Sequence, residues 1–100
     1  MLVANTLNNE MKKLGFHVFV SNAVYMRDVG KNTVLVVEAE MPDRKNIPSH
    51  GVYVYTFYKA QYLNEKLIRY KVYAERVSIR YCLMKVKKQV AFLKTHEIIQ

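Results

Sequence analysis

Hydrophobic and polar positions in the first 40 residues predict a helix followed by a β-hairpin. Leu7, Met11 and Leu14 are spaced i, i+4 and i+7, which places them on one face of a helix. Asn5 or Thr6 is a suitable cap for its start, and a glycine follows at position 15. Residues 16–26 and 33–40 are then rich in β-branched and aromatic side chains on either side of a glycine-containing turn, a pattern typical of a hairpin.

A third strand is expected after a loop. Residues 41–51 contain both prolines together with Asp, Asn and Ser, which predicts an exposed loop. Residues 52–58 then alternate in a way that places Tyr53, Tyr55 and Phe57 on one side of a strand.

The C-terminal part, residues 59–100, contains no glycine and no proline, which favours helix. A helix over 61–81 would align an apolar seam along one face, and a last helix over 82–96 would present Leu83, Val86 and Val90. Residues 76–83 also alternate polar and apolar positions as a strand would. The helix is preferred because no hairpin turn is evident between residues 59 and 83.

These elements predict an α+β fold for a single domain over residues 1–100, a length typical of one domain. The expected architecture is an N-terminal helix, a three-stranded antiparallel sheet, and one or two C-terminal helices packed on one face of that sheet. The longest apolar run, Val34–Val37, is far too short to span a membrane, and the N-terminus lacks the features of a signal peptide. A cytoplasmic location is therefore expected.

The distribution of charged residues indicates which class of partner the protein binds. The net charge is +8 at neutral pH. Residues 1–58 hold six basic and five acidic side chains, whereas residues 59–100 hold ten basic and three acidic ones. A surface of this sign attracts phosphate polymers. The sequence therefore predicts a nucleic-acid partner.

Arginine and lysine bind phosphate oxygens, and a tyrosine between them can stack on an unpaired base, which favours single-stranded DNA or RNA. The residues expected to carry this contact are Lys66, Arg69, Tyr73, Arg76, Arg80, Lys85, Lys87 and Lys88. Tyr53 and Tyr55 are candidates for additional stacking, as on the aromatic sheet faces of RNA-binding domains.

The predicted helix over 61–81 also carries a second apolar stripe, Ile68, Val72 and Ile79. Two apolar faces are difficult for a small chain to bury, so this stripe is a candidate interface with a larger protein or with a second copy. The favoured function is accordingly a non-catalytic accessory subunit that docks on a DNA- or RNA-processing enzyme in replication, recombination or transcription. The alternative is a protein-interaction module or inhibitor whose basic face binds an acidic protein.

Residues with catalytic or metal-binding chemistry are sparse. Glu38, Glu40 and Asp43 form the one acidic cluster, which would serve a small metal-dependent nuclease as a further alternative. The three histidines are far apart, and Cys82 is the single cysteine, so a zinc site and an intrachain disulfide are not expected. No enzyme activity, metal or cofactor is predicted.

Overall fold

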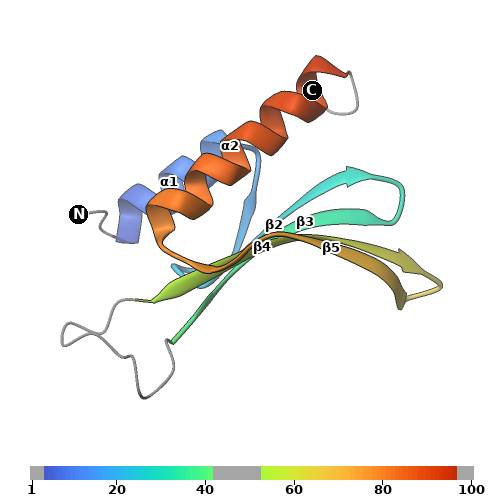
Figure 1. The fold of residues 1–100 in the computed structure, drawn as a ribbon, viewed down its shortest axis with the longest axis horizontal. Helices are drawn as coiled ribbons and strands as arrows, with labels where there is room; N and C mark the ends of the chain where they lie inside the picture. The colour runs from blue at the N-terminus through green and yellow to red at the C-terminus, as the bar shows by residue number, and fades with distance from the viewer. Residues whose placement is uncertain (1–3, 42–52, 97–100) are drawn as a thin grey trace.

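The computed structural model describes residues 4–41 and 53–96. Within them, five strands form an antiparallel sheet in the order β1-β2-β3-β4-β5, and two helices lie on one side of it (Figure 1). In chain order the elements are α1 (Ala4–Lys13), β1 (His17–Val20), β2 (Val24–Gly30), β3 (Thr33–Glu40), β4 (Val54–Leu63), β5 (Lys66–Val77) and α2 (Ile79–Thr95).

The sheet corrects the three-stranded prediction. One additional strand arises because residues 16–26 do not form a single strand of the predicted hairpin. A turn at residues 21–23, with Asn22 at φ 64°, separates β1 from β2. The other is β5, which occupies most of the segment 61–81 that was predicted to be helical. The α+β class is retained, with five strands in place of three.

The turn between β4 and β5 explains why the helix prediction was wrong. Asn64 and Glu65 have φ values of 52° and 67°, and two consecutive positive values are typical of a type I′ hairpin turn. Asparagine tolerates this conformation without glycine. The β-branched and aromatic residues of β5, such as Ile68, Tyr70 and Val72, then favour a strand once the turn brings them beside β4.

Both ends of the chain contain the predicted helices. In α1, Leu7 and Met11 face the core as expected, but Asn5 and Thr6 lie inside the helix and do not cap it. A single C-terminal helix, α2, begins at Ile79 and ends close to the predicted position. Ser78 caps it, because its Oγ accepts a hydrogen bond of 3.2 Å from the Tyr81 backbone N–H. Of the alternative strand over 76–83, only its first two residues belong to a strand, at the end of β5.

The core lies between the helices and one face of the sheet. α2 supplies Val86 and Val90 to it, α1 supplies Met11, and the strands supply Tyr25 and Phe57, all of which are buried. α2 contacts β4 and β5, whereas α1 contacts β1. The helices therefore cover one face of the sheet, which is called the helix side below.

Strand register defines the other face, called the open side below. Val37 pairs with Phe57, and both belong to the core, so they point to the helix side. The next pairs, Val36 with Tyr58 and Glu38 with Thr56, therefore point to the open side. None of the helices in the described part of the chain is long and apolar enough to cross a membrane. The predicted loop over 41–51 lies outside the described residues, except for Met41.

Candidate nucleic-acid interface

The outer surface of α2 carries two lysines between two aromatic side chains. Tyr81, Lys85, Lys88 and Phe92 follow one another at spacings of four, three and four residues, which places them on one face of the helix. Tyr81 and Phe92 are 45% and 52% exposed, which is unusual for rings of this size. The Lys85 Nζ atom lies 5.6 Å from the centroid of the Tyr81 ring, within cation–π distance.

Strand β5 brings a second lysine and tyrosine pair to the edge of this helix face. The Lys71 Nζ atom lies 5.5 Å from the centroid of the Tyr73 ring. The Tyr73 ring also contacts the buried Phe57, at 4.9 Å between ring centroids. The core therefore holds the Tyr73 ring in place. Partial burial raises the pKa of Tyr73, which keeps its hydroxyl neutral at physiological pH.

These two elements enclose a shallow pocket of about 280 Å³, called the basic-aromatic pocket below. Its lining residues are Tyr73, Lys85, Lys88, Gln89 and Phe92. Two ammonium groups can hold phosphate oxygens, the rings offer a surface for a base, and the Gln89 amide can donate and accept hydrogen bonds. The pocket thus brings two positive groups, two rings and an amide together.

More positive charge extends along the hairpin of β4 and β5. Lys59 and Lys71 are direct cross-strand partners, next to the pair of Gln61 and Arg69, and Lys66 follows at the hairpin end. By register, all of these side chains point to the helix side. Like charges placed opposite one another destabilise a sheet, so this pair concentrates positive charge on the helix side at some cost in stability.

Five of the eight predicted contact residues lie on the helix side of the sheet, in or near the pocket. Tyr73, Lys85 and Lys88 line the basic-aromatic pocket, and Lys66 and Arg69 lie farther along β5 on the same side of the sheet.

The remaining three lie elsewhere. The Arg76 Nη1 atom lies 2.5 Å from Glu40 Oε1, and Glu40 is on the open side. Lys87 Nζ lies 3.9 Å from Glu10 Oε2 of α1, and Arg80 is exposed in the first turn of α2.

The two candidate stacking residues are not equivalent. Tyr55 is only 7% exposed and belongs to the core, where burial raises its pKa. Its ring therefore has no free face for a base. Tyr53 is about half exposed just before β4. The core, not a ligand, accounts for the aromatic side that Tyr55 and Phe57 share.

The predicted partner stripe is also divided. Ile79 packs against the core at the start of α2. Ile68 and Val72 are exposed on β5, and Val72, which pairs with Tyr58, faces the open side. The three residues therefore do not form one surface.

Sequence reasoning missed Lys59, Lys71, Gln89 and Phe92. For the two residues of α2 a signal exists, because Lys85, Lys88, Gln89 and Phe92 have helical spacing. Lys59 and Lys71 are brought together by the β4–β5 register alone. That register depends on a turn that contains no glycine.

The residues with catalytic or metal-binding chemistry have structural roles where the structure describes them. The Tyr58 hydroxyl donates a 2.6 Å hydrogen bond to Glu38 Oε1, and Glu40 is paired with Arg76. Asp43 lies outside the described residues. In the segments that the structure describes, no three His, Cys, Asp or Glu side chains are grouped to hold a metal ion. Cys82 is buried in the core, which raises the pKa of its thiol to about 12 and makes it a poor nucleophile.

Comparison with known proteins identifies one significant relative. The uncharacterized protein YddA of Bacillus subtilis (strain 168) is 32% identical over 97 residues, which cover 96% of this chain and 90% of YddA. No family model matches the sequence. No solved structure matches it significantly.

Proposed function

The chain belongs to the same family as YddA of Bacillus subtilis, and we propose that it is a small non-catalytic nucleic-acid-binding protein. In this proposal it serves as an accessory subunit of a larger DNA- or RNA-processing enzyme, to which it contributes grip on the nucleic acid. The observation that carries the proposal is the basic-aromatic pocket, where two lysines and two partly exposed rings converge from α2 and β5.

Single strands are the favoured ligand because the rings need unstacked bases. The ring of Phe92 is exposed on the surface of α2, and Tyr73 is fixed by its contact with Phe57. Stacking of one base on an aromatic ring contributes about 1–3 kcal/mol and depends little on sequence. Lys71 and Lys59 extend the positive surface from the pocket along the hairpin, in a direction that a phosphate backbone can follow.

Salt dependence of oligothymidine binding tests the contact. The double substitution Lys85→Gln and Lys88→Gln is expected to weaken binding and to reduce the slope of log K against log[salt] by about 1.4, since each phosphate contact contributes about 0.7 on single strands. Fluorescence anisotropy of a labelled oligothymidine, measured over a range of salt concentrations, gives both quantities.

The matched control is Lys12→Gln with Lys13→Gln. These lysines are exposed at the end of α1 and the substitution removes the same charge. An equal loss of slope in both double variants would mean that general charge attraction, and not the pocket, holds the oligonucleotide. Phe92→Ala is expected to weaken binding with no change of slope, because stacking releases no counterions.

The alternative, an acidic protein partner, is separated by competition. Poly-glutamate presents carboxylates without bases, so it should displace the oligonucleotide weakly if the rings contribute to binding. Displacement at the same charge concentration as by unlabelled oligothymidine would favour the acidic protein.

A further inference from the structure

The open side of the sheet has the opposite electrostatic character from the helix side. By register, Asp28 pairs with Val34, and Glu38 and Glu40 pair with residues of β4, so all three carboxylates point to the open side. Among the described residues of β5, Arg76 lies there and is paired with Glu40. The lysines of β4 and β5 point to the helix side.

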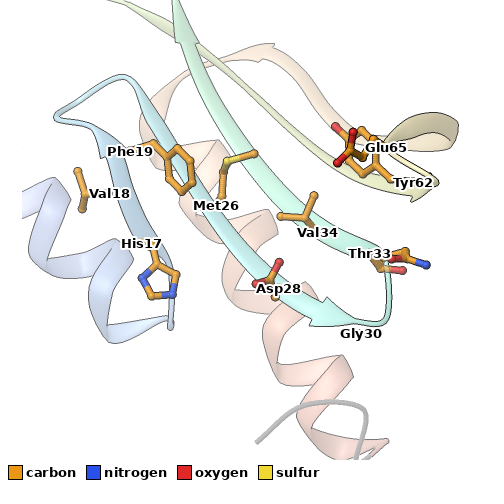
Figure 2. Close-up of a pocket in the computed structure, with 11 residues that line it drawn as sticks. His17, Val18, Phe19, Met26, Asp28, Gly30, Thr33, Val34, Tyr62 and Glu65 are labelled. Carbon is orange, nitrogen blue, oxygen red and sulfur yellow. The ribbon is translucent and has the colours of Figure 1, made fainter.

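A trough of about 1120 Å³ lies across this open side (Figure 2). It runs from β1, over β2 and β3, to the hairpin between β4 and β5. Figure 2 shows the side chains of Phe19, Met26 and Val34 on this surface, with Tyr62 and Glu65 at the far end and α2 behind the sheet.

Apolar side chains form much of the trough surface. Phe19 is 65% exposed, and Met26 and Val34 are partly exposed next to it. The apolar surface continues beyond the trough, where the rings of Tyr58 and Tyr70 lie 6.0 Å apart and Tyr70 is 60% exposed. Contiguous exposed apolar surface of this kind usually marks a protein interface.

Two carboxylates border the apolar surface. Asp28 lies on β2, beside the strand segment that carries Met26, and Glu65 lies on the β4–β5 turn. His17 of β1 also lines the trough, and none of its lining residues is a lysine or an arginine. An occupant that satisfies this surface needs apolar groups for the floor and positive groups that can reach Asp28 and Glu65.

We propose that the open-side trough is the docking site for a cationic amphipathic segment of the partner protein. The proposal rests on the accessory-subunit part of the proposed function and not on the nucleic-acid contact. It separates the two tasks: the partner segment binds between Phe19 and Tyr62, while the basic-aromatic pocket stays free on the opposite side of the sheet.

Charge complementarity favours this occupant over a second copy of the chain. The most positive surface of another copy is its helix side, so docking of that surface in the trough would cover the basic-aromatic pocket. Two open sides placed face to face would bring together the carboxylates of both copies, and like charges disfavour that contact.

A labelled amphipathic peptide built from leucine and lysine is a direct probe. It is expected to bind the intact protein saturably, and NMR titration should shift the methyl signals of Met26 and Val34. Asp28→Asn combined with Glu65→Gln should weaken binding about five- to tenfold, as expected for two partly solvated charge pairs. Phe19→Ser, which removes apolar surface without changing the charge of the trough, should weaken it further, and Phe19 is exposed, so the core is left intact.

Three controls make the result decisive. The Lys85→Gln, Lys88→Gln variant should bind the peptide unchanged, and Phe19→Ser should bind oligothymidine unchanged, which also verifies its fold. A peptide of the same composition with its leucines and lysines scrambled should bind poorly. Equal binding of the scrambled peptide, or shifts confined to α2, would overturn the proposal. Sedimentation provides a further test: a dimer that Phe19→Ser converts to a monomer would assign the trough to a second copy.

Discussion

Gly15 is the residue on which the connection between α1 and the sheet depends. Its φ is +87°, a value that L-amino acids adopt at a cost. The Arg27 guanidinium fills the space where a side chain at position 15 would begin, and it donates a hydrogen bond to the backbone carbonyl of Leu14. Conformation therefore favours glycine here, and a side chain at this position would displace the end of Arg27.

Gly15→Ala is expected to lower the free energy of unfolding by about 1–3 kcal/mol, because alanine is strained at this φ and its methyl group displaces the Arg27 guanidinium that donates a hydrogen bond to the Leu14 carbonyl. Urea denaturation followed by circular dichroism measures the change. Gly30→Ala is the matched control, since a methyl group there would meet only Thr33 Cβ, at 4.0 Å. If the two variants were equally stable, Gly15 would have no special role.

At the scale of elements, the hairpin of β4 and β5 distinguishes the structure from the sequence-based prediction. The helices were predictable because their apolar residues recur at helical spacing and pack on one core, as Met11 does in α1 and Val86 in α2. β5 was not, because Asn64 and Glu65 make a tight turn without the glycine that usually marks one. Tertiary pairing with β4 then overrides the preference of a glycine-free stretch for helix.

The same turn couples stability to the proposed docking site. Glu65→Gly is expected to raise the free energy of unfolding by about 0.5–1 kcal/mol, because Asn-Gly is the preferred sequence for two positive φ values. It should also weaken binding of the leucine–lysine peptide, because a trough carboxylate is lost. Urea denaturation and peptide anisotropy measure the two effects. A variant that is destabilised, or that binds the peptide normally, would contradict this account of Glu65.

The candidate site was predictable only in part, because the expected helix over 61–81 is a strand. Tyr73, Lys85 and Lys88 come together as expected of a basic surface that includes a tyrosine. Arg76 does not join them. It lies near the end of β5 with a φ of 52°, and its side chain pairs with Glu40 on the open side. A helical model of residues 61–81 placed Arg76 with Tyr73, whereas the strand register places it on the opposite side of the sheet from Lys71.

At the scale of the whole molecule, charge is divided between the two sides of the sheet. The excess of basic residues in 59–100 predicted a positive surface, but not the location of the acidic residues. Alternation along the strands sends Lys59 and Lys71 to the helix side and Asp28 and Glu38 to the open side. A protein organised in this way can hold a polyanion on one side and a cationic partner segment on the other.

The most direct test of this two-sided account is an NMR titration of the intact protein with oligothymidine. The account predicts that signals of Tyr73, Lys85 and Phe92 shift progressively while those of Met26 and Val34 on the open side stay in place. Shifts centred on Met26 and Val34, or spread evenly over both sides of the sheet, would contradict it.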